Sequence, residues 1–242
     1  DQESFYVGIR LQMQEGWHTY WENPGDSGSP FEAIWKTNTS TIVENVQWPT
    51  PVTIPYPPLM TYGYEGDIVF PFKVFRSIDE DLSKISVDVD FLICADICIP
   101  EQASLTLDLT SINPDPLLDI AIKNLPTEFI QTHSTLNGDQ LQVTFKSSKP
   151  LSTAYLFPRE NDLFVYIAKH DFIQLNENTY QISLPILKSN FESFSGVLSL
   201  DGEGFQFKEK IQPIANISLW QAILFALIGG LILNLMPCVF PI

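Results

Sequence analysis

The chain has 242 residues and a formal net charge of -16, from 29 Asp and Glu against 13 Lys and Arg. This balance argues against nucleic-acid binding, because neutralising phosphates requires clustered Lys and Arg. Hydrophobic residues make up 45% of the chain, which excludes a disordered protein. The 18 prolines, together with many Thr, Val, Ile and Phe, favour β-structure over a helix bundle.

Strands are predicted in the first half from runs of alternating apolar and polar residues. A further strand is predicted over the largely apolar run Ile68–Val74, with Pro71 marking an edge or a bulge. Ile85–Ile93 and Ala103–Leu109 each place apolar side chains on one face and polar ones on the other. The connection between these two runs carries a close pair of cysteines.

The second half shows a short helix and further strands. A helix is predicted over Leu117–Lys123, after two prolines. The predicted strands are Leu141–Phe145, Thr153–Phe157, Phe164–Ala168, Tyr180–Leu184, Gly196–Leu200 and Gly204–Phe207. This spacing predicts a mainly β protein with two immunoglobulin-like β-sandwiches, over residues 1–115 and 135–215, joined by a linker at 116–134. The second sandwich has no thiol; its last hairpin turns at Asp201–Gly204.

The C-terminal stretch has the character of a membrane segment. Ile211–Ile242 contains no charged residue, and about 20 apolar residues span a bilayer. We expect the start of a first transmembrane helix over residues 217–242, with Trp220 at the interface and Pro237 breaking the helix before Cys238. We further expect a larger membrane protein to continue beyond residue 242, and any signal peptide to have been removed before Asp1.

The cysteines are the candidate catalytic residues. Cys94 and Cys98 are separated by three residues, close enough for a disulfide if the connection turns, while Cys238 is remote. A bridge closing so small a loop contributes little stability, which favours a reversible redox couple over a staple. No cationic residue lies nearby in sequence and Asp96 lies between the two, so we expect a pair presented to a more reactive partner.

Two other interpretations of the cysteine pair stay open: a purely structural disulfide and a metal site. A metal site is disfavoured because the histidines are scattered, at His18, His133 and His170. The prediction is therefore no metal and no cofactor beyond the redox-active cysteines.

Three stretches together resemble the DsbD-type thiol:disulfide interchange proteins, and most closely the suppressor-of-copper-sensitivity B branch. Gly16–Gly28 is similar to the N-terminal signature of that branch. Cys94–Pro100 resembles its periplasmic cysteine hairpin, and Asn234–Pro241 resembles the first helix of the transmembrane reductase domain.

The resemblance implies an extracytoplasmic protein-disulfide reductase. Electrons would pass from a membrane cysteine pair that includes Cys238, through a thioredoxin-like domain beyond residue 242, to Cys94 and Cys98. From there they would reach periplasmic disulfide-bonded proteins of thioredoxin fold; disulfide isomerases, cytochrome c maturation factors and copper-tolerance thioredoxins are all compatible substrates. Residues 1–215 would lie in the periplasm of a bacterium, anchored in its inner membrane. By resemblance, Cys98 is the nucleophile.

The chain departs from the better-known members in having a shorter spacing between the two cysteines. Those members shield the cysteines with a cap loop that carries an aromatic side chain. Thr61–Gly66 stands at the corresponding place, so Tyr64, or alternatively Tyr62, is the predicted cap; both tyrosines could instead only pack on the sandwich edge. His18 is either an acid or base near the thiols or a hydrogen-bonded structural residue.

Two functions from other classes are compatible with the same features. One is a membrane-anchored β-sandwich binding module with a structural disulfide. The other is a copper-handling domain, for which the sequence offers no Met or His cluster.

Overall fold

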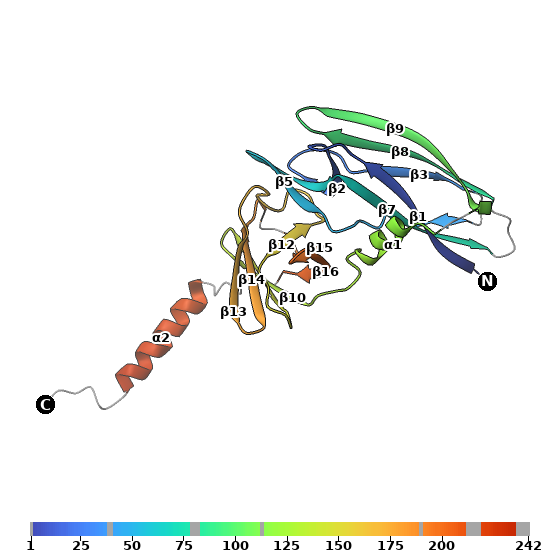
Figure 1. Ribbon diagram of the computed structural model, residues 1–242. Helices are drawn as coiled ribbons and strands as arrows, with labels where there is room; N and C mark the ends of the chain where they lie inside the picture. Colours follow the sequence, from blue (N-terminus) through green and yellow to red (C-terminus); the bar gives the residue numbers. More distant parts are fainter. Residues whose placement is uncertain are drawn as a thin grey trace.

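The computed structural model describes residues 2–37, 41–77, 83–111, 114–188, 191–211 and 219–235. Its described residues are mainly β, as predicted, and Figure 1 shows the strands gathered in one body with a helix standing apart at the C-terminal end. Strands before residue 110 form two sheets, and strands after residue 130 form two others. The assignment of these pairs of sheets to immunoglobulin-like domains with the boundaries given above stays a prediction.

The first pair of sheets encloses an apolar core. One sheet has the order β1 (Gln2–Gln12), β7 (Asp67–Ser77), β4 (Ile42–Val43). The other has the order β3 (Glu32–Lys36), β8 (Lys84–Cys94), β2 (His18–Gly25), β6 (Leu59–Glu65), β5 (Val52–Tyr56), with β9 (Cys98–Asp108) paired to β8. The inward side chains of β7 and β8, such as Phe70, Phe72 and Val87, are buried, and Phe31 stacks on Phe70 with ring centroids 4.7 Å apart. Burial of one face of each strand fixes the register, since a slip by one residue would expose the core side chains.

The β8–β9 hairpin is the longest antiparallel ladder of the second sheet. It runs from the pair Lys84 and Asp108 to the pair Cys94 and Cys98 without a register shift. The alternation over Ile85–Ile93 and Ala103–Leu109 therefore predicted both strands correctly. Since the ladder ends at the cysteines, they face each other at its tip.

The strands after residue 130 form a four-stranded and a three-stranded sheet. The first has the order β10 (Thr132–Asn137), β11 (Gln140–Lys146), β14 (Thr179–Pro185), β13 (Asp171–Asn176); the second has the order β12 (Ala154–Pro158), β15 (Ser193–Leu200), β16 (Glu203–Lys210). The prediction of a strand over Phe164–Ala168 was wrong: Phe164 makes one isolated bridge to Ile186, and the Ala168 N–H donates to the Val165 carbonyl in a turn.

Two strands of this half escaped prediction because they lack a clear alternation of apolar and polar residues. β13 is an edge strand whose side chains are nearly all exposed, so burial imposes no apolar pattern on it. β10 buries Ser134, a polar residue, at its centre. The predicted short helix is confirmed as α1 (Pro116–Lys123), where the Asp115 side chain accepts from the Leu117 N–H and caps the first turn.

The two pairs of sheets meet along a continuous buried seam. Tyr62 of β6 packs edge-on against Tyr155, Phe157 and Tyr166 from the second half, with ring centroids 5.0–6.0 Å apart. Asn23 of β2 is fully buried, and its Nδ2 donates to the carbonyls of Pro158 and Glu160 at 2.8 and 3.2 Å. The contact is therefore both apolar and specifically hydrogen-bonded.

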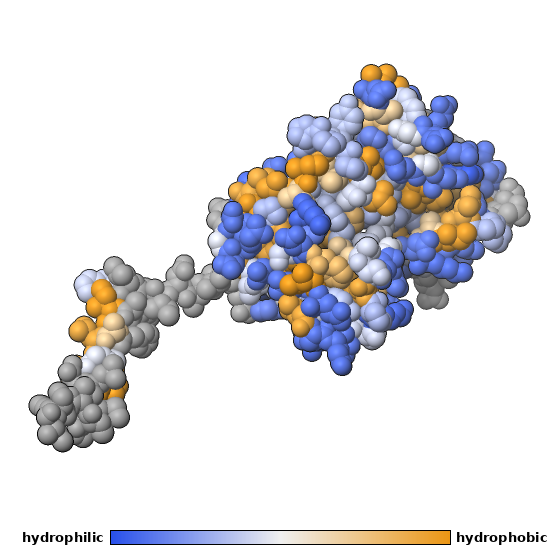
Figure 2. Space-filling model, turned by 60° about the vertical axis from the view of Figure 1, so that its left-hand side comes forward, coloured by the Kyte–Doolittle hydropathy of each residue, from blue (hydrophilic) through white to orange (hydrophobic). Residues whose placement is uncertain are grey.

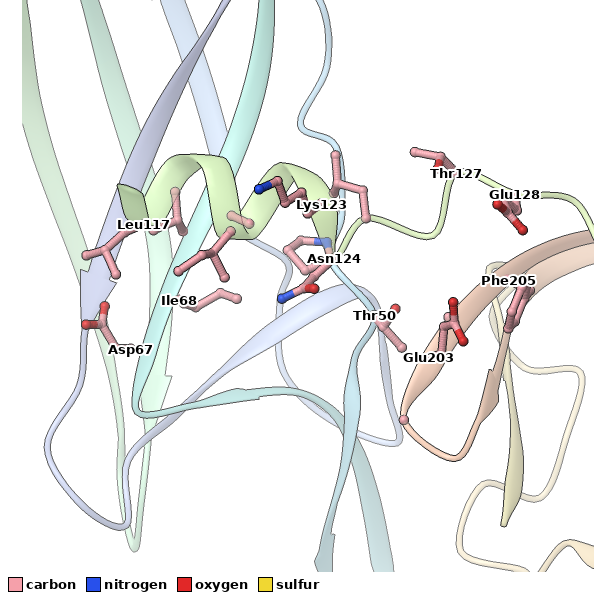
Figure 3. Close-up of a pocket in the computed structure, with 17 residues that line it drawn as sticks. Thr50, Asp67, Ile68, Leu117, Lys123, Asn124, Thr127, Glu128, Glu203 and Phe205 are labelled. Carbon is pink, nitrogen blue, oxygen red and sulfur yellow. The ribbon is translucent and has the colours of Figure 1, made fainter. Parts of the chain in front are cut away.

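The tip of the β15–β16 hairpin, Asp201–Gly204, holds no thiol and closes a second part of this seam; its turn is Asp201–Gly202, and Gly204 already lies on β16. A Cβ on Gly204 would lie 1.9 Å from Thr50 Oγ1, so only glycine allows so close an approach. Beside it is a cavity of about 730 Å³ between α1, β7 and this turn. Figure 3 shows Leu117 and Lys123 of α1 and Glu203 of β16 around it.

The C-terminal helix α2 (Leu219–Leu235) is apolar, and its Trp220, Leu227 and Leu231 are exposed. Figure 2 shows hydrophobic residues along its described part. Among the described residues, no helix has the length and hydropathy needed to cross a membrane. The predicted segment 217–242 extends beyond α2, and Pro237 lies outside the described residues.

Asn23→Ala should weaken the seam. The substitution removes the donor to two buried carbonyls, so we expect the free energy of unfolding in urea to fall by about 1–3 kcal/mol. Asn161→Ala is the matched control, because Asn161 is exposed and should change this value by less than about 0.5 kcal/mol. Equal losses in the two variants would contradict the assigned hydrogen bonds.

His170 should make stability depend on pH. It is buried, stacks on Tyr155 and accepts from the Leu156 N–H, and burial lowers its pKa to about 4. In the unfolded chain the His170 imidazole binds a proton below about pH 6.5, whereas in the folded chain it does so only near pH 4. The free energy of unfolding therefore falls as the pH drops from 6.5 to 4. Between pH 7 and 5 we expect a loss of about 2 kcal/mol in wild type that is missing in His170→Asn, measured by urea unfolding. A variant with the same pH slope as wild type would refute this origin.

Candidate functional site

The two cysteines of the hairpin tip form a disulfide. Its S–S distance is 2.00 Å and the Cα atoms of Cys94 and Cys98 are 4.1 Å apart. In the turn between them, the Ala95 N–H donates to the Ile97 carbonyl at 3.0 Å. The last pair of a β-ladder thus places both sulfurs in bonding distance, which explains how so short a spacing still closes a bridge.

The two sulfurs of this bridge differ in their access to solvent. Cys94, at the end of β8, is 1% exposed, whereas Cys98 is exposed at the start of β9. The preceding Ile97 is 64% exposed. A thiol from another molecule can therefore approach Cys98, while Cys94 is covered by the protein.

The cover over Cys94 is Tyr20 of β2. Its hydroxyl donates a hydrogen bond to Cys94 Sγ at 2.7 Å and lies 3.7 Å from Cys98 Sγ. The Tyr20 side chain is 2% exposed, and burial raises the pKa of its hydroxyl, so the group stays protonated and acts as a donor at neutral pH. Such a donor stabilises negative charge on Cys94 when the disulfide opens.

Close packing fixes the position of the Tyr20 ring. Gly28 adopts a φ of +106°, and a Cβ there would lie 2.0 Å from a ring atom of Tyr20. On the same strand as Tyr20, the Thr19 hydroxyl donates to the carbonyl of Leu92 on β8 at 3.0 Å and ties β2 to β8. The Gly16–Gly28 stretch thus supplies both the tyrosine and the glycine on which its ring rests.

A row of four side chains crosses the sheet at this point. In the register of the sheet, Glu65 of β6 pairs with His18 of β2, His18 pairs with Cys94, and Cys94 pairs with Cys98. Directly paired residues of antiparallel strands point to the same face with Cβ atoms about 4.5–5.5 Å apart. Burial lowers the pKa of His18, and the charge of Glu65 opposes that shift.

Comparison with known proteins assigns this part of the chain. Residues 1–110 match the family model described as the N-terminal domain of the thiol:disulfide interchange protein DsbD. Residues 1–110 belong to the DsbD N-terminal family. This range contains both cysteines, Tyr20, His18 and Glu65, so the whole row lies within the matched domain.

The fold resembles a solved structure over most of its length. The crystal structure of the N-terminal periplasmic domain of ScsB from Proteus mirabilis superposes with a TM-score of 0.68 at 20% sequence identity. The match covers 86% of this chain and 87% of that chain, so it includes the strands after residue 130 as well as the DsbD N-terminal domain. Comparison with curated protein sequences returns no match.

The aromatic residues predicted as a cap occupy different places in this DsbD N-terminal domain. Thr61–Gly66, predicted as a loop, lies almost entirely in strand β6. Tyr64 is buried in the core and its hydroxyl donates to the Pro49 carbonyl at 2.7 Å, while the Tyr62 hydroxyl lies 3.3 Å from that of Tyr155 in the seam. The side chain that the described contacts place on the sulfurs is Tyr20 instead.

The parity of the strands explains this difference. Tyr64 pairs with Thr19, and side chains alternate between faces, so Tyr62 and Tyr64 point to the face opposite the one that carries Tyr20. His18 and Tyr20 share the face of the disulfide, with ring centroids 5.3 Å apart. The sequence shows that His18 and Tyr20, two residues apart on one strand, share a face. Predicting that this face carries the disulfide required knowing which strand pairs with β8.

The remaining site predictions concern Cys238 and metals. Cys238 lies outside the described residues. No group of three or more His, Cys, Asp or Glu side chains suited to a metal ion occurs in the part of the chain that the structure describes.

Tyr20→Phe should slow opening of the disulfide while keeping the cover in place. The aromatic ring is retained, but the Cys94 thiolate that forms when the disulfide opens would lack its hydrogen-bond donor. A hydrogen bond to a charged acceptor contributes about 1.5 kcal/mol or more. We expect reduction by dithiothreitol at pH 7 to slow about tenfold. The rate is measured from the appearance of free thiols. Tyr56→Phe, at an exposed tyrosine, is the matched control and should react like wild type; an unchanged rate in Tyr20→Phe would remove the role assigned to its hydroxyl.

Proposed function

We propose that this chain is the extracytoplasmic part of a membrane protein-disulfide reductase, and that Cys94 and Cys98 carry out thiol–disulfide exchange. The observation that carries the proposal is the asymmetry of the bridge: Cys98 is exposed at a hairpin tip, and Cys94 is buried under a hydrogen-bond donor. A structural staple needs no such difference between its two sulfurs. Membership of residues 1–110 in the DsbD N-terminal family supports the same chemistry.

The reducing half-reaction begins at the exposed sulfur. In the reduced pair, the Cys98 thiolate attacks one sulfur of a substrate disulfide; a bond forms between Cys98 Sγ and that sulfur, and the other substrate sulfur leaves as a thiolate. Cys94, held beside it by the hairpin, loses its proton and attacks Cys98 Sγ. The Cys94–Cys98 bond forms, the second substrate thiolate leaves, and two electrons have moved to the substrate.

Recharging reverses these steps with a reduced dithiol partner. The partner's thiolate attacks Cys98 Sγ, and Cys94 leaves as a thiolate stabilised by the Tyr20 hydroxyl. The partner's second thiol then releases the reduced pair and becomes part of a disulfide in the partner. We propose that this partner is a thioredoxin-like domain beyond residue 242, and that the substrates are periplasmic disulfide proteins of thioredoxin fold. The exchange needs no cofactor besides the cysteines.

The C-terminal stretch supports a membrane anchor in this proposal. Ile211–Ile242 has no charged residue, and the exposed side chains of α2 include Trp220, Leu227 and Leu231. Apolar surface of this kind requires a partner or a lipid environment. Within the proposal, Cys238 belongs to a membrane relay that feeds the thioredoxin-like domain, and residues 1–215 face the periplasm.

Single-cysteine variants should trap partners unequally. Cys94→Ser leaves the exposed thiol without its resolving partner, so oxidised glutathione should form a stable mixed disulfide at Cys98. Cys98→Ser leaves only the buried Cys94, and we expect its mixed disulfide to form at least about tenfold more slowly, measured by mass spectrometry. The same order should hold for an oxidised thioredoxin-fold protein. Failure of both variants to form any mixed disulfide would leave the structural disulfide as the better interpretation.

A further inference from the structure

We propose that His18 exchanges the proton of the Cys94 thiol during the resolving step, and that Glu65 positions and tunes the imidazole. This inference rests on the proposed thiol–disulfide exchange and assigns a proton route to its buried half. The pair Cys94–Cys98 has an evident electron path, because the sulfurs are bonded to each other. Tyr20 gives the buried sulfur a hydrogen-bond donor, but the thiol of the reduced pair also needs an acceptor for its proton.

The sheet places His18 beside that sulfur. His18 is the direct cross-strand partner of Cys94, so both side chains stand on the same face at the spacing of neighbouring strands. On its other side, His18 pairs with Glu65. The row Glu65–His18–Cys94–Cys98 thus runs from a carboxylate at an exposed position, through an imidazole, to the buried and then the exposed sulfur.

The ionisable groups that face His18 assign the roles within this row. From β6 it meets Glu65, from its own strand Tyr20 at 5.3 Å between ring centroids, from β8 Cys94, and from β9, one strand further, Cys98. Tyr20 is a donor whose pKa is raised by burial, so it cannot take a proton at neutral pH. His18 has its pKa lowered by burial, so its neutral imidazole is the available base.

A base is needed because Cys94 is buried. A buried thiol loses much of the water that would stabilise its thiolate, and the described hydrogen bonds give it one donor, Tyr20. An imidazole that accepts the thiol proton makes the thiolate available where little water can stabilise it. A nearby carboxylate then stabilises the imidazolium that forms. Glu65 raises the pKa of His18 in this sense, against the larger effect of burial.

The proton balance is complete in both directions. In the resolving step, the proton of Cys94 Sγ passes to the His18 imidazole, Cys94 attacks Cys98 Sγ, and the departing substrate thiolate takes a proton from the imidazolium or from water. In recharging by a reduced dithiol, Cys94 leaves Cys98 Sγ and receives its proton back from the imidazolium. Electrons move only between sulfurs, and His18 returns to its neutral form after each cycle.

The test follows the decay of the Cys98–glutathione mixed disulfide after the reduced chain is mixed with oxidised glutathione, from pH 5.5 to 9.5, by acid quench and mass spectrometry. In His18→Gln we expect decay at pH 7 to be about tenfold slower than in wild type, since only a few per cent of an ordinary thiol is ionised there. At pH 9.5 the difference should shrink to less than about twofold, because the thiol then ionises without a base. A merely structural role of His18 would not be rescued by high pH.

His133→Gln is the matched control, because His133 is exposed on β10 and should leave the pH profile unchanged. Glu65→Gln provides a second variant at an exposed position, and removing its charge should move the acid limb of the profile to lower pH. A profile in His18→Gln that parallels wild type at every pH, or an acid limb that stays in place in Glu65→Gln, would overturn the inference. A different result would contradict the proposed function itself: no mixed disulfide would form at Cys98, either in wild type or in Cys94→Ser.

Discussion

The pairing of strand β2 with the end of β8 is the interaction on which the rest of the site depends. It brings the Tyr20 hydroxyl to 2.7 Å from Cys94 Sγ and makes His18 the neighbour of the same residue. Without β2, both sulfurs would stand at the tip of an open hairpin with equal access to solvent. With β2 in place, Cys94 is buried and hydrogen-bonded while Cys98 is exposed, and the proposed direction of exchange rests on this inequality.

The same strand also connects the site to the second half of the molecule. A few residues beyond Tyr20, the Glu22 carboxylate accepts from Arg159 Nε at 2.6 Å, and Asn23 is fully buried against the carbonyls of Pro158 and Glu160. The strands after residue 130 carry no thiol among the described residues, yet they hold one end of the strand whose other end covers the disulfide. Their role is therefore structural support for β2 as well as for Tyr62 in the seam.

Sequence patterns predicted those features that are determined within a single strand or helix. Alternation predicted β8, β9 and most strands of the second half, and two prolines in front of an apolar run indicated α1. The cysteine pair was recognisable because it fell in the turn between two clear strands. Edge strand β13, which buries almost nothing, and the turn after Phe164 carried no such signal.

The cap could not be predicted in this way, because it depends on which strands are neighbours. Tyr62, Tyr64 and Tyr20 all stand in apolar, glycine-containing stretches, and nothing in the sequence tells which of them faces the cysteines. Only the register of β2 against both β6 and β8 places Tyr20 on the disulfide face and the other two in the core. The resemblance to a family pointed to an aromatic shield, but this chain supplies it from a different strand than the one expected.

In the proposed exchange, Cys98 is the exchanging sulfur and Cys94 the protected one. The most direct measurement is the alkylation rate of each thiol in the fully reduced wild-type chain, with an iodoacetamide pulse at pH 7.5 and assignment of the label by peptide fragmentation. We expect Cys98 to be modified at least about tenfold faster than Cys94, because Cys94 is 1% exposed and lies under Tyr20. Equal rates, or faster modification of Cys94, would contradict it.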